Sequence, residues 1–312
     1  MCARIKVAIF APEILPIPMK TFCLIALSVL LLSCSEVEEP GADDIENQAE
    51  ELICRSETDP QVMAMNDGHS EMLAMNFIIT RKLGFKYRIY KPAEASEPDE
   101  ERFPLIIYLH GIDVRGNDNI RHLDYIADSL VSYAKRHAAY VVCPQCPIEP
   151  YWSLKSRPDN FQPNNMELAP EASYMSTGLT RLIGELVNEY RVDSTRVYIM
   201  GKSMGGISTL DMIVRHRSKF AAASAFSATI NPQRFRGKNE VPLMLFHNIN
   251  DGAIPVEGSR QTFKRLKALG CEVEYIEGND GGHDSWSMAF KDTKMLDWLL
   301  SHRRIVETES QN

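Results

Sequence analysis

The segment GKSMG, residues 201–205, sets a serine between two glycines. Glycines two positions before and after a serine permit a turn so sharp that no larger side chain would fit. Serine becomes a nucleophile when a histidine removes its proton and a carboxylate fixes the tautomer of that histidine. Asp251 and His283 follow Ser203 in the segments INDGA and GGHDS. The order of these three residues predicts acyl transfer through a serine nucleophile.

Residues 201–203, GKS, also resemble the end of a phosphate-binding loop. That loop requires a glycine five residues earlier, where this chain has Arg196. Residues 197–200, VYIM, are typical of a strand. After the serine, apolar residues recur at helical spacing, at Ile207, Leu210 and Ile213. A strand, a sharp turn and a helix are the context of an exposed nucleophile, so this interpretation is favoured over the phosphate loop and over a plain Gly-Ser turn.

Other acids and histidines lie near these residues in the sequence. Asp280 and Asp284 flank His283 and are alternative acids, but Asp251 lies a few residues past a predicted strand. We expect Asp284 to cap the last helix instead. The remaining histidines are expected to pack at a strand end (His247), to brace a loop (His110) or to lie on the surface (His216 and His302).

Acyl transfer also requires N–H donors directed at the developing oxyanion. The Met204 amide is one candidate, because it follows the serine at the start of a helix. The second is expected from the loop after the strand FPLIIYL, at Ile112 or Gly111.

The elements that must position these residues alternate between strands and helices. Expected strands are a hairpin at 76–91 around Gly84, then 103–109, 138–143, 197–200, 219–225, 242–247 and 272–277. Expected helices lie near 123–134, at 179–190, after Ser203, at 257–269 ahead of Gly270, and at 285–300. The alternation predicts an α/β fold with a mainly parallel sheet and helices on both faces. Sites in such sheets form at the carboxyl ends of the strands, where all the candidate residues lie.

Composition narrows the possible ligands. The 312 residues are 44% hydrophobic, enough for a sizeable core, and the net charge is −8. This charge argues against nucleic acid or an anionic membrane surface as a partner. Because His, Cys and Asp residues do not cluster at ligand spacing, neither a metal nor a cofactor is expected.

The N-terminus is typical of an exported protein. Residues 22–34, FCLIALSVLLLSC, form an apolar run after Lys20 that suits a signal peptide and is too short for a permanent span. Its end, LLSC, resembles the bacterial lipobox, which predicts lipidation of Cys34; an ordinary secretory signal or a membrane anchor is the alternative. Met19 is an alternative start. We expect a signal segment (1–34), an acidic tether (35–70), a catalytic domain (71–303) and a tail (304–312).

Four cysteines would remain in the mature protein, at Cys54, Cys143, Cys146 and Cys271. An oxidising compartment would allow up to two disulfides among them, so fewer than four free thiols are expected. Cys143 and Cys146 have redox spacing, but no thioredoxin-like pattern surrounds them. A local disulfide or two buried thiols are both favoured over a redox role.

Several segments together resemble a known family. They are PLIIYLHGIDVRGNDN, VVCPQCPIEPYWS, VYIMGKSMGG, NINDGAIPVEGSRQTFKRLKALGCEVEY and GGHDSWSMAF. Over about residues 75–302 the chain looks like the esterase branch of the α/β-hydrolases, related to feruloyl and acetylxylan esterases of carbohydrate esterase family one and often labelled predicted peptidases.

The resemblance implies roles for particular residues. It gives Ser203, Asp251 and His283 the triad roles and gives Met204 with Ile112 the oxyanion role. It also places Gln145 and Trp152 near the substrate mouth, and Trp286 is a further candidate contact. In the family, HG is followed by a small residue and another glycine. Residues 112–114, IDV, depart from this pattern, and we expect them to narrow the acyl pocket.

These observations predict a lipid-anchored serine esterase of the bacterial cell envelope, in the periplasm or at the cell surface. The expected substrates are small esters or acetyl and feruloyl esters of carbohydrates, cleaved through an acyl-enzyme. A serine peptidase with the same triad and a non-catalytic, glycan-binding lipoprotein are the alternatives.

Overall fold

The computed structural model describes residues 71–305, except for 81–82, 97–99, 155, 167–170 and 239. The predicted signal segment with Cys34, the acidic tether and Cys54 lie outside the described residues. Among the helices that are described, none is long and apolar enough to cross a membrane.

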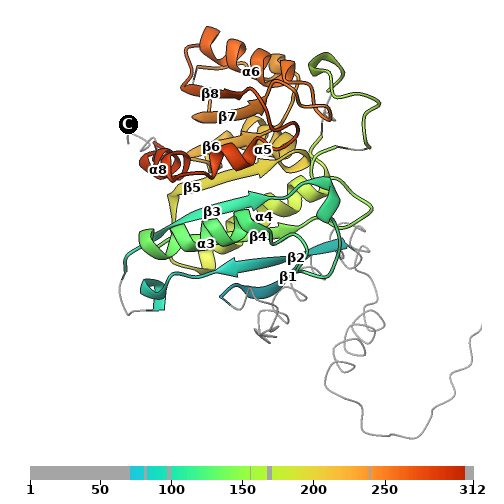
Figure 1. The fold of residues 1–312 in the computed structure, drawn as a ribbon. Coiled ribbons are helices and arrows are strands. Elements are labelled where there is room, and N and C mark those ends of the chain that lie inside the picture. Colours follow the sequence, from blue (N-terminus) through green and yellow to red (C-terminus); the bar gives the residue numbers. More distant parts are fainter. Residues whose placement is uncertain are drawn as a thin grey trace, which may run out of the picture. The chain divides into compact units, whose positions relative to one another are not determined.

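In the described part, eight strands form one sheet with the order β1-β2-β4-β3-β5-β6-β7-β8 (Figure 1). The strands are β1 (Leu73–Thr80), β2 (Leu83–Tyr90), β3 (Phe103–Leu109), β4 (Tyr140–Gln145), β5 (Val192–Lys202), β6 (Ala222–Phe226), β7 (Leu243–Asn248) and β8 (Val273–Gly278). β2 runs antiparallel to both neighbours, β1 and β4. All other neighbours are parallel, so the carboxyl ends of β3 to β8 meet at one edge of the sheet.

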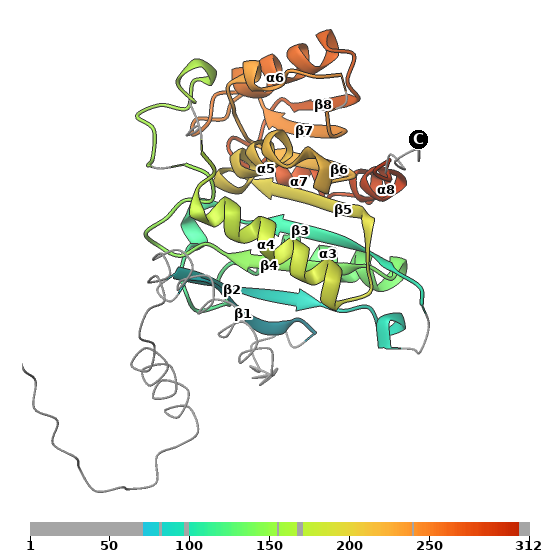
Figure 2. The same ribbon diagram turned by 180° about the vertical axis from the view of Figure 1, so that it is seen from behind.

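Helices cover both faces of the sheet. One face carries α3 (Tyr125–His137), α7 (Trp286–Ala289) and α8 (Lys294–Ser301), and the other carries α4 (Tyr174–Glu189), α5 (Met204–Arg215) and α6 (Glu257–Ala268) (Figures 1 and 2). Short 3-10 turns lie at Ala93–Ser96, Ile112–Val114, Pro163–Asn165, Arg217–Lys219 and Pro232–Arg234. The predicted α/β fold with a mainly parallel sheet is therefore confirmed.

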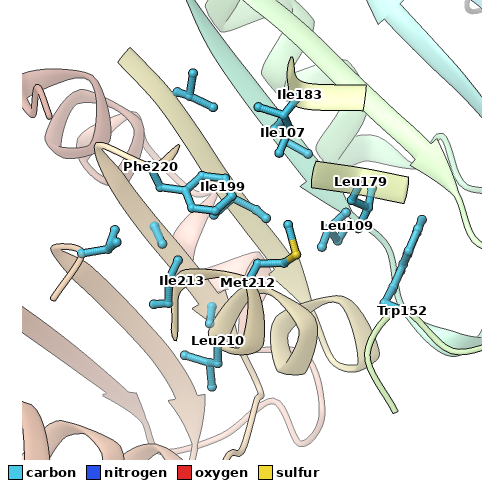
Figure 3. Close-up of a cluster of buried hydrophobic side chains, with 14 of the residues drawn as sticks. Ile107, Leu109, Trp152, Leu179, Ile183, Ile199, Leu210, Met212, Ile213 and Phe220 are labelled. Atoms are coloured by element: carbon cyan, nitrogen blue, oxygen red, sulfur yellow. The ribbon is translucent and has the colours of Figure 1, made fainter. Parts of the chain in front are cut away.

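The continuous apolar sequence of β3 follows from its central position. Leu105, Ile107 and Leu109 point toward α4 and α5, whereas Ile106 and Tyr108 point toward α3. All of these side chains are buried, and each contributes roughly 1.5–3 kcal/mol through the loss of contact with water. Figure 3 shows Ile107 beside Ile183 and Leu109 beside Leu179, both residues of α4. This packing fixes the loop that follows β3, which carries Gly111 and Ile112.

The last predicted helix, 285–300, is wrong as a single element, because the structure contains α7 and α8 with a break between them. Phe290 ends α7 and packs its ring 5.8 Å from that of Phe226. The Asp292 carboxylate then accepts from the Lys294 amide, and the Thr293 hydroxyl donates to Asp297. Such side chains compete with the backbone for hydrogen bonds and so begin a new helix. The predicted hairpin is present as β1 and β2, but its turn is not at Gly84: Gly84 lies inside β2, paired with Ile78, and the turn connects Thr80 to Leu83.

The described cysteines Cys143, Cys146 and Cys271 are free, buried thiols. Cys143 belongs to the core beneath α3, and Cys146 belongs to the core beneath α4, on the other face of the sheet. Of the two predictions left open for this pair, buried thiols are therefore correct and the local disulfide is wrong. Burial raises the pKa of both thiols, which disfavours the reactive thiolate.

Candidate active site

Ser203 lies on a strained turn between β5 and α5. Its φ and ψ angles are 54° and −119°, a combination that non-glycine residues rarely adopt. A Cβ added to Gly201 would lie 2.4 Å from the carbonyl oxygen of Gly205, and one added to Gly205 would lie 2.0 Å from that of Leu109. Both glycines are therefore required by the close approach of the backbone. The Ser203 amide donates to the Phe226 carbonyl at 2.9 Å and so fixes the turn against β6.

Lys202 precedes the serine, and its ammonium group contacts an acidic and an aromatic side chain. Its ammonium group forms an ion pair with Asp124, which caps α3 by accepting from the Ile126 amide. The same ammonium lies 4.9 Å from the ring centroid of Trp286. Lys202 therefore ties the turn to α3 and α7.

His283 connects the serine to a carboxylate. Its Nε2 atom lies 2.8 Å from Ser203 Oγ, and its Nδ1 atom lies 2.8 Å from Asp251 Oδ2 and 3.0 Å from Oδ1. Asn248 and Asn250 hold the loop that carries His283. The side-chain amide of Asn248 donates to the Gly282 carbonyl, and the backbone amide of Gly282 donates to the side-chain oxygen of Asn250. The loop therefore directs the imidazole ring at Ser203.

The Asp251 side chain is fully buried in the loop after β7. Its Oδ1 atom accepts from the amides of Ala253 and Ile254, both at 2.9 Å. Its Oδ2 atom also lies 3.1 Å from Nε2 of a second histidine, His247. Burial by itself raises the pKa of a carboxyl, but the hydrogen bonds from His247, His283 and the Ile254 amide outweigh it and hold the pKa of Asp251 well below its usual value. Asp251 is therefore ionised at neutral pH beside His283.

The alternative acids occupy other positions. Asp284 accepts from the Ser287 amide at 3.0 Å and so caps α7, as predicted. Asp280 accepts from Asn250 and from the Gly281 amide and so shapes the loop. Neither carboxylate contacts His283 in the described residues.

The other histidines also have structural partners. His110 is buried, and its ring bridges the Gly111 carbonyl and the Cys146 amide, which braces the loop as predicted. Burial and the neighbouring His122 lower the pKa of His110 to about 3, so the ring is neutral. His302 is half-buried against the Trp298 ring and bonds to Glu272, and His216 is half-buried after α5; neither is the exposed residue expected from the sequence.

Two backbone amides lie beside Ser203. Met204 is the first residue of α5, where the helix dipole favours negative charge. Gly111 approaches from β3, since a Cβ added to it would lie 3.7 Å from Ser203 Cβ, and Ile112 follows it at the start of a 3-10 turn. Within the described residues, the amides of Met204 and Ile112 donate to no backbone carbonyl. Both are therefore available to a ligand.

A cavity of about 210 Å³ opens beside the serine. Its apolar lining is formed by Ile112, Tyr151, Leu154, Phe161, Met204, Ile207, Ala253 and Ile254. Ser203, His283, Asp113 and Arg157 supply the polar groups. Ile112 and Asp113 of the segment IDV therefore line this space, and Val114 does not. An apolar wall with few polar groups is typical of a pocket for a small organic ligand.

Residues 91–297 match a family model described as phospholipase/carboxylesterase. The chain belongs to this family. The chain is 24% identical over 172 residues, 52% of this chain, to the bifunctional acetylxylan esterase/xylanase XynS20E of Neocallimastix patriciarum, and it spans 22% of that protein. The α/β-hydrolase resemblance seen in the sequence is thereby confirmed.

Two solved structures are similar to this chain. A thermostable esterase is 28% identical with a TM-score of 0.64, and the match covers 75% of this chain and 64% of the other. A ferulic acid esterase is 16% identical with a TM-score of 0.56, and the match covers 74% of this chain and 97% of the other. At that identity the second likeness shows the fold alone.

The three residues predicted to contact substrate, Gln145, Trp152 and Trp286, lie outside the lining of the cavity. Gln145 is fully buried, accepts from the Asn119 amide and donates to the Val114 carbonyl, so it holds the loop after β3. Trp152 is also fully buried and donates to the His110 carbonyl. Trp286 is half-buried, with its ring 5.6 Å from that of His283. None of the three lines the cavity.

Sequence reasoning missed the residues that hold the site together. Asn248 and Asn250 anchor the loop of His283, and Arg115 donates to the carbonyls of Ile112 and Ile148. Arg115 thereby joins the amide at Ile112 to the loop that carries Tyr151. Only the asparagines could have been found from the sequence, because Asn248 ends β7 and Asn250 follows it in the loop.

Proposed function

We propose that this protein hydrolyses carboxylic esters through an acyl-enzyme formed on Ser203. The observation that carries the proposal is the continuous series of hydrogen bonds from Ser203 Oγ through His283 to the buried carboxylate of Asp251. Membership in the phospholipase/carboxylesterase family supports it.

The geometry supports a two-step mechanism. His283 Nε2 takes the proton from Ser203 Oγ, which attacks the ester carbonyl, and the amides of Met204 and Ile112 donate to the oxyanion. The tetrahedral intermediate collapses to an acyl-Ser203 ester, and the leaving alkoxide takes the proton from His283. Water then loses a proton to His283 and attacks the acyl group, and the released Ser203 oxygen recovers that proton. Asp251 stabilises the imidazolium in both steps.

We further propose that the substrates are acetyl or feruloyl esters of carbohydrates. Tyr151, Phe161 and Leu154 give the cavity an apolar wall suited to a short or aromatic acyl group, and Asp113 with Arg157 can bond the hydroxyl groups of a sugar. The acetylxylan esterase relative supports this class of substrate.

The full chain should hydrolyse chromogenic acetyl, butyryl or feruloyl esters, and peptidyl anilides should react far more slowly, because an amide needs stronger protonation of its leaving group. Initial rates over the four substrate types at pH 7.5 measure this preference. Faster cleavage of the anilide would replace the esterase proposal with a peptidase, and no turnover of any substrate would favour a binding role.

Asp251→Asn should lower kcat by about 10⁴-fold, because the amide favours the wrong tautomer of His283. The matched variants Asp280→Asn and Asp284→Asn change the two neighbouring acids and should retain activity within about tenfold. Steady-state kinetics on the ester that the wild type cleaves best compares all three. A larger loss of kcat in Asp284→Asn than in Asp251→Asn would show that Asp284, and not Asp251, is the acid that supports His283.

We also propose that the protein is a lipoprotein of the bacterial cell envelope, anchored through Cys34; the sequence LLSC supports this. In a bacterial host, the full chain should fractionate with membranes and incorporate labelled palmitate, and Cys34→Ser should do neither. Cys23→Ser is the matched control, because Cys23 lies inside the predicted signal and should not affect labelling. Equal labelling of Cys34→Ser and the wild type would exclude the anchor.

A further inference from the structure

A second histidine contacts the carboxylate of Asp251. His247 lies in β7 four residues before Asp251, and its side chain is fully buried. Its Nε2 atom lies 3.1 Å from Asp251 Oδ2 and 2.9 Å from the Ile254 carbonyl oxygen. Its Nδ1 atom lies 2.8 Å from Ser259 Oγ in α6. The mechanism described above makes no use of this residue.

The neighbours of His247 determine where its proton lies. A carboxylate oxygen and a carbonyl oxygen can only accept, so Nε2 must carry the hydrogen. Ser259 Oγ lies 3.1 Å from the Ala228 carbonyl oxygen and can serve Nδ1 either as donor or as acceptor. In both arrangements, the Nε2 hydrogen is shared between the Ile254 carbonyl oxygen at 2.9 Å and Asp251 Oδ2 at 3.1 Å.

Asp251 Oδ2 is shared by the two histidines. It receives His283 Nδ1 at 2.8 Å and His247 Nε2 at 3.1 Å, whereas Oδ1 receives two backbone amides. We propose that His247 is a positioning residue for the hydrolytic reaction: its N–H group fixes Oδ2 of Asp251 in line with His283 and withdraws part of the charge of the carboxylate. This inference rests on the proposed function, because it assigns His247 a role only through Asp251.

The inference predicts the direction in which the pH profile of the reaction moves, and simple loss of packing would move it the other way. Without the His247 N–H group, more of the negative charge on Oδ2 acts on the His283 imidazolium, so the acidic limb of the kcat/KM profile should move to higher pH. Displacement of Asp251 would weaken that attraction and move the same limb to lower pH. The other charged groups around the two histidines, among the described residues, are Glu277 of β8, which pairs with Arg260 of α6, Lys202 of β5 beside Trp286, Asp113 and Arg157 in the cavity, and Asp280 and Asp284 in the His283 loop. The variants described next leave these groups unchanged.

His247→Gln and His247→Met form a matched pair of similar length, of which only glutamine keeps an N–H group that can reach Asp251. His247→Met should lower kcat by about 10- to 100-fold, the size found when the outer partner of a functional group is removed, with KM nearly unchanged. His247→Gln should recover most of that loss. The acidic limb of the kcat/KM profile should move to higher pH in His247→Met, because that limb reports protonation of the essential base in the free enzyme.

A double-mutant cycle with Asp251→Asn provides the second measurement. If His247 acts through Asp251, His247→Met should cost at most about twofold in the Asp251→Asn background, since coupled residues are not additive. Additive losses, equal losses in the Gln and Met variants, or an acidic limb that moves to lower pH would each overturn the inference. If His247→Met fails to fold, His247→Leu replaces it in the same cycle.

The same assay separates the two proposals. The wild type and Ser203→Ala are measured beside the His247 variants. An active Ser203→Ala protein would refute the proposed function itself, whereas an inactive Ser203→Ala with a wild-type rate in His247→Met would refute only the role of His247.

Discussion

Replacing Ser203 with alanine should abolish ester turnover, with a loss on the order of 10⁶-fold in kcat, because the attacking oxygen is removed. A fluorophosphonate probe should label the wild type at Ser203 and leave the variant unlabelled. The melting temperature should change by less than about 2 °C, since His283 is the only side-chain partner of the hydroxyl among the described residues, and the hydroxyl faces a cavity. Intact-protein mass spectrometry and calorimetry provide these measurements.

Ser224→Ala is the matched control for this variant. Ser224 lies in the neighbouring strand β6, and its buried hydroxyl donates to the Met244 carbonyl. Its removal should cost about 1 kcal/mol of the free energy of unfolding and leave both turnover and labelling intact. Full activity in Ser203→Ala, or probe labelling at another serine, would exclude the nucleophile proposed here.

Replacing His283 with alanine should reduce kcat nearly as much as replacing Ser203, on the order of 10⁶-fold, because an unassisted serine hydroxyl is a weak nucleophile. The double variant Ser203→Ala/His283→Ala should be no slower than either single variant, since the two side chains act as one unit. Single-turnover kinetics with an activated ester compares the three proteins.

His302→Ala controls for the loss of an imidazole. His302 is half-buried and bonds to Glu272, in a part of the molecule that does not line the cavity. Its replacement should leave kcat within about twofold, as for a substitution away from the reacting groups. A substantial rate in His283→Ala, or a double variant slower than both singles, would show that His283 and Ser203 do not form one catalytic unit.

The sequence predicted those parts of the fold whose cause is local. The apolar run of β3 and the strand, turn and helix around Ser203 follow from spacing that neighbouring residues impose. The break at Phe290 was missed, because the packing of its ring on Phe226 joins segments far apart in the chain. The cysteines show the same limit, since their separation by the sheet cannot be read from a C-x-x-C spacing.

The site divides in the same way. Ser203, Asp251 and His283 were found because a known order of residue types connects them, and the structure brings all three together. Gln145 and Trp152 were proposed as contacts from resemblance, but burial and bonds to the backbone place them behind the loop after β3. Whether a polar side chain faces a ligand or braces a loop depends on tertiary contacts, which spacing does not encode.

Ser203 and His283 are hydrogen-bonded to each other, but backbone contacts hold Ser203 in place, whereas side-chain contacts hold the loop of His283. Ser203 is enclosed by backbone from β3, β5 and β6, and its amide is bonded to Phe226. The His283 loop depends on the side chains of Asn248 and Asn250, with Gly282 at a φ of 58°. The Ser203 amide should therefore exchange its hydrogen far more slowly than the Gly282 amide, which a smaller, local opening would expose. Such an opening would move His283 away from Ser203 while the turn that carries the serine stays folded.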